Sequence, residues 1–197
     1  MKNAVKSIIV CITLLSVFLS VILTVDAHVL SPEDLKLLEA IENGNLKAAQ
    51  SALKNGADAN QKEKCIPYRT FLMVAASGGS EDLAKLLTKY GADVNAIDVD
   101  GHTALMEAAS FGHLNVVRFL VEHGAKVNAE ATVGGYKVYT ALIYASENGH
   151  VDIVKYLIKQ GSNINAKKIN GDTALSLAEN NGHTEVAGIL REAGAKE

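Results

Sequence analysis

A sequence segment that is repeated along the chain constrains the fold more than any other feature of the sequence. The best preserved copy is Gly101 to Asn128, GHTALMEAASFGHLNVVRFLVEHGAKVN. Other copies keep three markers in the same order: a threonine, a glycine between two apolar segments, and a closing glycine. The closing glycines are spaced by 35, 33, 37 and 33 residues, at Gly56, Gly91, Gly124, Gly161 and Gly194. A period of this length is typical of a solenoid whose units stack in one direction.

Two short helices are predicted within each copy. In the best preserved one, Thr103 can cap the first helix, because its side-chain oxygen can accept a bond from a free amide at the helix start. The second helix would present an apolar stripe at helical spacing, formed by Val116, Val117, Leu120 and Val121. Gly124 would end this helix, because glycine tolerates left-handed torsions.

The first copy, residues 31 to 65, lacks the threonine and predicts a terminal repeat. Ser31 as a cap, followed by proline, favours a helix from about Pro32 to Glu42. A second helix is expected from about Asn45 to Lys54, with Leu46 among its buried residues. The apolar face of the first helix is expected to consist of Leu35, Leu38 and Ile41.

Several phrases resemble one known repeat. GHTALMEAA, FGHLNVVRFLVEHGAKVN, NGHVDIVKYLIKQGSNIN and YGADVN are similar to the ankyrin repeat, with its turn, two antiparallel helices and 33-residue period. The resemblance covers residues 31 to 197, as about five repeats. It implies an all-α repeat solenoid, an ankyrin array of helix pairs with β-turn or hairpin fingers. The repeats would be an N-terminal capping repeat 31–65, then 66–100, 101–137 with a hairpin insertion at its end, 138–170, and a C-terminal capping repeat 171–197.

The chain departs from the family's usual TPLH phrase. TFLM, TALM, TALI and TALS stand in its place, so the proline and the histidine are absent from every copy. The histidine hydrogen bonds that tie family repeats together therefore do not carry over directly, and apolar packing by Met73, Met106 and Ile143 is the expected substitute. A different set of histidines follows the glycine between the helices, where the resemblance implies a structural role. These are His113, His150 and His183.

The most individual stretch is the insertion between Ala131 and Tyr139. Gly134-Gly135, between β-branched and aromatic residues, predicts a two-residue hairpin turn, because both glycines can adopt positive φ. This turn would place Thr132 opposite Lys137. Two interpretations stay open: a tolerated surface insertion, or an elongated finger that reaches a partner.

Residues 1 to 27 differ from the rest of the chain. Two lysines precede an uncharged, mostly apolar run from Ser7 to Val25, which predicts a signal peptide cleaved before His28. The protein would then be exported, either periplasmic or secreted, with a bacterial envelope as one possible setting. The alternative is an uncleaved membrane anchor, because 19 residues at about 1.5 Å each approach the thickness of a bilayer core. After cleavage Cys65 would be the remaining cysteine, so no internal disulfide is expected.

Charge and motifs narrow the function. Without the leader, the chain has 17 basic and 21 acidic residues. The basic residues form no stripe along the sequence, which argues against nucleic acid as a partner. No nucleophile and base stand together in the sequence, and histidines separated by whole repeats suit no single metal ion. We therefore expect no enzyme activity, no cofactor and no metal. The unfavoured alternative is an enzyme or metal protein built on His102 with neighbouring acids.

Binding of another protein is the expected function. In ankyrin arrays the turn tips and the exposed residues of the first helices form a concave binding surface, and the resemblance transfers that role here. Tyrosine is favoured at binding hot spots, which points to the tyrosines of this surface. The competing interpretation is that Tyr139 and Tyr144 only pack the hairpin against the next helix. The predicted contact residues are Tyr68, Arg69, Asp100, His102, Glu107, Tyr136, Lys137, Tyr139, Tyr144 and Asp172.

Overall fold

The computed structural model describes residues 30–63, 68–133 and 137–196. Ser31 to Glu197 form one compact unit, which is separate from the unit that precedes it. The predicted leader, residues 1–27, and Cys65 lie outside the described residues. Within the described part of the chain, no helix combines the length and apolarity needed to cross a membrane.

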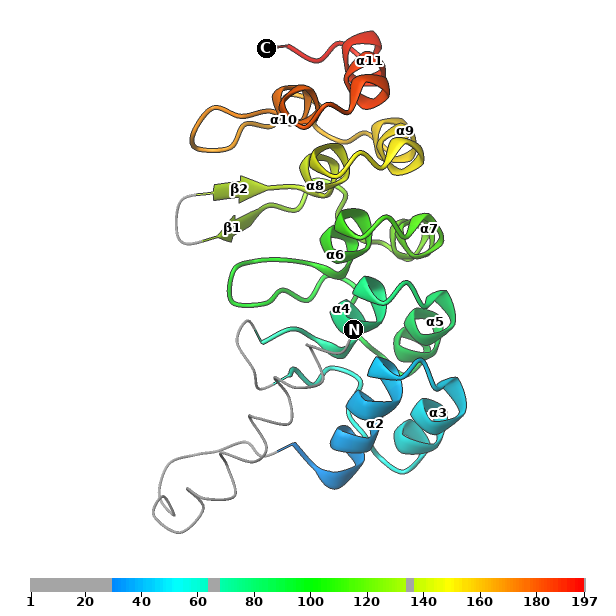
Figure 1. Ribbon diagram of the computed structural model, residues 1–197. Helices are drawn as coiled ribbons and strands as arrows, with labels where there is room; N and C mark the ends of the chain where they lie inside the picture. Colours follow the sequence, from blue (N-terminus) through cyan, green and yellow to red (C-terminus); the bar gives the residue numbers. More distant parts are fainter. Residues whose placement is uncertain (1–29, 64–67, 134–136, 197) are drawn as a thin grey trace. The chain divides into compact units, whose positions relative to one another are not determined.

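The unit consists of five helix pairs. The first helices of the pairs, here called the inner helices, stand in one row, and the second, outer helices stand beside them in another (Figure 1). The inner helices are α2 (Pro32–Glu42), α4 (Phe71–Ser77), α6 (Ala104–Ser110), α8 (Ala141–Glu147) and α10 (Ala174–Asn180). The outer helices are α3 (Leu46–Lys54), α5 (Glu81–Lys89), α7 (Leu114–Glu122), α9 (Val151–Lys159) and α11 (Thr184–Glu192). The predicted all-α repeat solenoid is confirmed.

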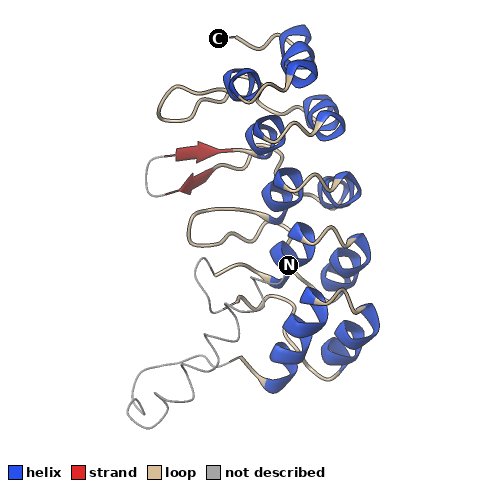
Figure 2. Cartoon of the chain, in the orientation of Figure 1, coloured by secondary structure: helices blue, strands red, loops and turns tan. Residues whose placement is uncertain are grey.

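Each of the last four inner helices follows a loop, here called a finger, on the side away from the outer helices (Figure 2). The fingers comprise residues 61–69, 96–102, 129–139 and 166–172, numbered 1 to 4. Single bridges join Lys62 with Thr70 at finger 1 and Lys167 with Thr173 at finger 4; residues 64–67 of finger 1 lie outside the described residues. Finger 3 contains the two strands of the insertion.

Local chemistry explains the inner helices. The hydroxyl of each predicted capping threonine accepts a bond from the amide three residues later, for example Met106 N to Thr103 Oγ1 at 3.3 Å. Met73, Met106 and Ile143 are at most 1% exposed, so the expected apolar packing between repeats is confirmed. Burying a side chain of this size stabilises the fold by about 1.5–3 kcal/mol. The capping threonines are Thr70, Thr103, Thr140 and Thr173.

The predicted face of α2 is only partly right, because Ile41 is buried as expected, Leu38 is half-buried and Leu35 is exposed. Leu35 is 49% exposed, and in α3 Leu46 is also exposed. Positions three apart on a helix differ by about 300°, so a run of three-residue steps drifts away from one line along the helix. Packing against α3 and α4 selects another face instead. The buried residues of α2 are Asp34, Leu37, Ala40 and Ile41.

The hairpin forms with a different register from the predicted one. Strands β1 (Ala131–Val133) and β2 (Lys137–Tyr139) are antiparallel and pair Thr132 with Val138, so the predicted pairing of Thr132 with Lys137 is wrong by one residue. Residues 134–136, which include the predicted glycine turn, lie outside the described residues. A tertiary bond fixes β1, because the Thr132 amide donates to the Asp100 carbonyl of finger 2 at 2.7 Å. A slip by one residue would turn buried Ala131 outward.

Candidate interaction surface

Part of the polar surface belongs to the framework that ties repeats together. His113 Nε2 donates to the Ser77 carbonyl of the preceding repeat at 2.9 Å, and His150 and His183 make the equivalent bonds. Each ring lies against the inter-helix glycine of the preceding repeat; a Cβ on Gly79 would fall 2.5 Å from His113 Nδ1. These three histidines join adjacent repeats, which confirms their expected structural role.

A second ladder of hydrogen bonds runs along the loops that follow the outer helices. Asn95 Nδ2 donates to the Gly124 carbonyl at 3.0 Å, and Asn95 Oδ1 accepts from the Lys126 amide at 2.8 Å. Asn60 and Asn128 form the same pair of bonds with the repeats that follow them. The sequence signal for this ladder is the asparagine that lies four residues after each of the first four closing glycines.

Outside the framework, one contact rule links the fingers to the inner helices. The residue just before a capping threonine meets the residue four positions after the threonine of the next repeat. Arg69 therefore reaches Glu107, with Nη2 3.2 Å from Oε2. His102 likewise reaches Tyr144, with Nε2 2.7 Å from the hydroxyl. Four of the predicted contact residues thus meet in pairs across repeats.

The Arg69–Glu107 pair is half-buried, with side chains 23% and 18% exposed. Arg69 also donates to Ser77 Oγ and to the Met73 carbonyl on α4. Burial raises the pKa of Glu107, and Arg69 and His102 only partly offset this shift. The pair consequently fixes finger 1 against α4 and α6 and is not a free charged group.

A buried carboxylate orients His102. Asp98, whose side chain is 1% exposed, accepts from the amides of Asp100 and His102 at 2.9 Å and lies 3.2 Å from His102 Nδ1. The carboxylate favours a proton on Nδ1, which leaves Nε2 to bond with the Tyr144 hydroxyl 2.7 Å away. Burial, with the neighbouring Tyr139 as the next cause, raises the pKa of Tyr144, which opposes formation of a phenolate. The row of Asp98, His102 and Tyr144 therefore acts as a structural hydrogen-bond chain.

The two tyrosines of the insertion region stack on each other. The rings of Tyr139 and Tyr144 lie 4.7 Å apart with planes inclined by 14°. Lys168 of finger 4, in the next repeat, lies over the ring of Tyr139. Its Nζ is 4.2 Å from the ring centroid and 3.0 Å from the Tyr139 hydroxyl. Lys168 is buried. An ammonium is rarely buried without a partner, and here the partner is Tyr139. The structure thus gives both tyrosines a packing role, and their role in binding stays a prediction.

The remaining predicted residues are more scattered. Tyr68 is 43% exposed and has a φ of 62°, a left-handed conformation that is uncommon outside glycine. Asp100 lies in finger 2, where its amide donates to Asp98, and Asp172 lies in finger 4. Tyr136 and the side chain of Lys137 lie outside the described residues.

Sequence reasoning missed exposed apolar side chains on the fingers. Ile97 and Val99 of finger 2 are 52% and 61% exposed, and Ile169 of finger 4 is 67% exposed. Val99 and Ile169 occupy the same finger position, four residues before the capping threonine. Aligning the fingers, rather than the helices, would have shown this pattern.

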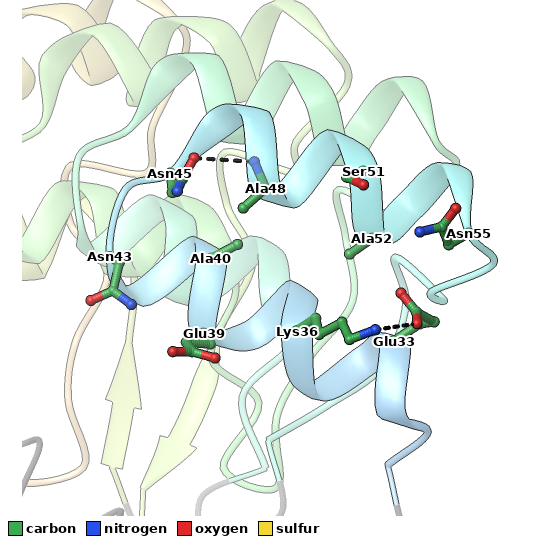
Figure 3. Close-up of a pocket in the computed structure, with 10 residues that line it drawn as sticks. All are labelled: Glu33, Lys36, Glu39, Ala40, Asn43, Asn45, Ala48, Ser51, Ala52 and Asn55. Atoms are coloured by element: carbon green, nitrogen blue, oxygen red, sulfur yellow. Dashed lines mark hydrogen bonds and ion pairs between the residues drawn. The ribbon is translucent and has the colours of Figure 1, made fainter.

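A metal centre and a surface hollow are the two other kinds of candidate site. In the described part of the chain, no three histidine, cysteine, aspartate or glutamate side chains are placed to hold a metal ion. A hollow of about 400 Å³ lies between α2 and α3 and is lined mainly by polar side chains such as Lys36, Glu39 and Asn43 (Figure 3). This polar surface fits the first repeat as a cap that faces water.

Comparisons with known proteins agree with this geometry. A family model of ankyrin repeats in three copies matches residues 37–131 and 133–197, and a second ankyrin model matches residues 106–158. M-phase phosphoprotein 8 of Rattus norvegicus is 37% identical over 68 residues, which are 34% of this chain and 8% of that protein. An ankyrin repeat protein of fowlpox virus is 41% identical over 71 residues, covering 36% of this chain and 10% of its own.

A shorter relative is Protein phosphatase 1 regulatory subunit 27 of Homo sapiens, 38% identical over 65 residues, or 33% of this chain and 41% of that protein. The chain thus spans less than half the length of each of these relatives. The repeated helix pairs, the fingers and the two bonded ladders all recur at the period that the family models match. The chain belongs to the ankyrin repeat family.

Proposed function

We propose that this chain is an exported protein-binding module that acts through its inner helices and fingers. The observation that carries the proposal is the exposure of Ile97, Val99 and Ile169 at the fingers. Ile97 and Val99 lie together on one finger, and exposed apolar side chains that cluster mark interaction surfaces more often than isolated ones do. The framework has no use for these side chains, because the repeats are joined through histidine, asparagine and buried apolar contacts.

The family supports the same function. Ankyrin repeats generally mediate contacts between proteins, and one relative is named as a regulatory subunit of a phosphatase. A solenoid presents a long surface assembled from equivalent positions of successive repeats, which suits recognition of another protein.

A pair of tyrosines offers a direct test of the surface. Tyr68 on finger 1 and Tyr90 at the end of α5 are exposed to similar extents, 43% and 37%. Partner capture from the native host, quantified by mass spectrometry, should fall about tenfold for Tyr68→Ala and stay unchanged for Tyr90→Ala. Equal recovery with both variants, at equal thermal stability, would exclude finger 1 from the interface.

Export needs its own experiment. The leader composition supports cleavage before His28, and the mass of the protein isolated from its native host would locate the mature N-terminus. The measured mass is expected to be that of a chain whose first residue is His28. Retention of residues 1–27 would instead favour the membrane-tethered scaffold.

A further inference from the structure

Charge is divided between the two rows of helices. The inner helices carry seven acidic residues and a single lysine, Lys36, which bonds to Glu33 at 2.6 Å. The outer helices carry eight basic and six acidic residues. The acidic residues of the inner helices are Glu33, Asp34, Glu39, Glu42, Glu107, Glu147 and Glu179. The net charge of the whole chain, −3, does not reveal this division.

Four of these acids occupy equivalent positions of the repeat. Glu39 and Glu107 share one position of the repeat, and Glu42 and Glu147 share another, three residues later. Glu63 joins them from finger 1, where its amide donates to the Arg69 carbonyl at 2.8 Å. These carboxylates form an acidic row along the inner helices, and we keep that name for Glu39, Glu42, Glu63, Glu107 and Glu147.

Neighbouring carboxylates of the acidic row influence one another. Burial raises the pKa of Glu42, and Glu39 raises it further. Burial also raises the pKa of Glu63; Arg69 opposes this shift, whereas Glu42 and Glu107 add to it. Arg69 is already bonded to Glu107, so the negative charge around Glu63 is only partly compensated.

The exposed apolar side chains lie next to this charge. Finger 1 contacts finger 2 through Lys62, whose Nζ donates to the Ile97 carbonyl at 2.9 Å. Finger 2 contacts α8 through His102 and Tyr144. The fingers and the inner helices therefore form one continuous surface, on which Ile97 and Val99 are exposed and the helices are acidic. The basic side chains of the fingers are partly engaged within the protein: Lys62 bonds to Ile97, Arg69 to Glu107 and Lys168 to Tyr139.

We propose that this surface binds an extended segment of a partner protein in which lysine or arginine residues alternate with apolar residues. The inference rests on the proposed binding function and specifies the chemistry of the partner. The basic side chains lie along the acidic row, and the apolar ones cover Ile97 and Val99. Complementary charge of this kind speeds association and selects against acidic partners.

Peptide binding to the full chain tests the inference. A fluorescein-labelled peptide of about twelve residues, with the triplet Lys-Val-Ser repeated, would extend over about 40 Å at about 3.3 Å per residue. Fluorescence anisotropy should show that it binds at least about tenfold more tightly than the matched Glu-Val-Ser peptide, and that salt weakens the binding. A Lys-Ser-Ser peptide, which keeps the charge and loses the apolar groups, should bind about tenfold more weakly than Lys-Val-Ser.

Two matched double variants test whether the inner or the outer helices supply the negative charge that binds the peptide. Glu42 and Glu147 end the inner helices α2 and α8, whereas Glu122 and Glu192 end the outer helices α7 and α11. Glu42→Gln with Glu147→Gln should weaken Lys-Val-Ser binding about fivefold, whereas Glu122→Gln with Glu192→Gln should change it less than about twofold. Both variants change the net charge equally, and all four residues occupy the same position in their helices.

A third pair of variants locates the apolar contact. Ile97→Ser with Val99→Ser should weaken binding of the same peptide about tenfold, and Leu46→Ser on α3 should leave it unchanged. Equal effects of the inner and outer charge variants, tight binding of the Glu-Val-Ser peptide, or no binding of the Lys-Val-Ser peptide would each overturn the inference. The proposed function is judged separately: partner capture that depends on Tyr68 would stand even if the basic peptide fails to bind.

Discussion

The contact between a histidine and a glycine is the smallest unit that holds this array together. The His183 ring lies against Gly149 and donates from Nε2 to the Glu147 carbonyl at 3.1 Å. Gly149 has a φ of +75°, so the glycine both permits the turn and leaves room for the ring of the next repeat. Gly182, in the last repeat, has a φ of +77° and no atom near its missing Cβ. The same residue type thus serves two purposes in the internal repeats and one at the end.

This difference predicts unequal effects of the same substitution. Gly149→Ala and Gly182→Ala both place an alanine at positive φ, which costs about 1–2 kcal/mol. At Gly149 the new Cβ would also fall 2.6 Å from His183 Nδ1, and the overlap should cost about 1–3 kcal/mol more. Urea denaturation of both variants would measure the difference. Equal losses of stability would show that the ring moves aside freely.

A second prediction concerns Ser146. This residue is fully buried, and its Oγ has no hydrogen-bond partner among the described residues. Equivalent positions carry Ala76 and Ala109. Ser146→Ala should raise the free energy of unfolding by about 1 kcal/mol, because an unsatisfied buried hydroxyl is removed. Ser77→Ala is the control and should lower it by about 1 kcal/mol, because Ser77 Oγ bonds to Arg69 and to the Val74 carbonyl.

At the scale of elements, the hairpin illustrates how tertiary contacts override a local turn signal. The glycine pair predicted a two-residue turn, yet three residues separate the strands. The bond from Thr132 to finger 2 and the stack of Tyr139 on Tyr144 fix the two ends of the hairpin. Both contacts join residues from different repeats or different elements, so the local sequence contains no direct signal for them.

Substitutions at Tyr144 should separate the stack from the hydrogen bond. Tyr144→Phe keeps the ring beside Tyr139 and removes the bond to His102, so it should cost about 1 kcal/mol of unfolding free energy. Tyr144→Leu also loses the aromatic pair, which adds about 0.5–1.5 kcal/mol. Thermal denaturation measures both. A control is Tyr156→Phe on α9, whose hydroxyl has no hydrogen bond within the described part of the chain, and it should be nearly neutral.

At the scale of the whole array, each helix packs mainly on its own pair and on the equivalent helices of the adjacent repeats. Stability in such a structure is approximately a sum of terms for repeats and for the interfaces between neighbours. The end repeats have one interface each, and the polar lining of the hollow on α2 and α3 reflects this exposure.

The position of a cavity along the array should therefore decide how far its effect spreads. Leu120 in α7 and Leu190 in α11 are both fully buried, so either leucine-to-alanine substitution should cost about 2–5 kcal/mol locally. Hydrogen exchange should accelerate mainly in α10 and α11 for Leu190→Ala. Leu120→Ala should accelerate exchange in α7 and in the repeats on both sides. Uniform acceleration throughout the array by Leu190→Ala would contradict this neighbour-limited description.

The sequence by itself determined the number of repeats, the order of the helix pairs and the threonine caps. These features depend on residues within one repeat, such as Thr103 and the amide of Met106, and the period repeats the same signal several times. The tertiary structure alone decided that Leu37 rather than Leu35 of α2 is buried, and it decided the register of the hairpin and the histidine partners. It also placed Lys168 against Tyr139, although finger 2 has an aspartate at the equivalent position. Each of these outcomes depends on a contact between elements or repeats, whose energy is absent until the neighbouring element is in place.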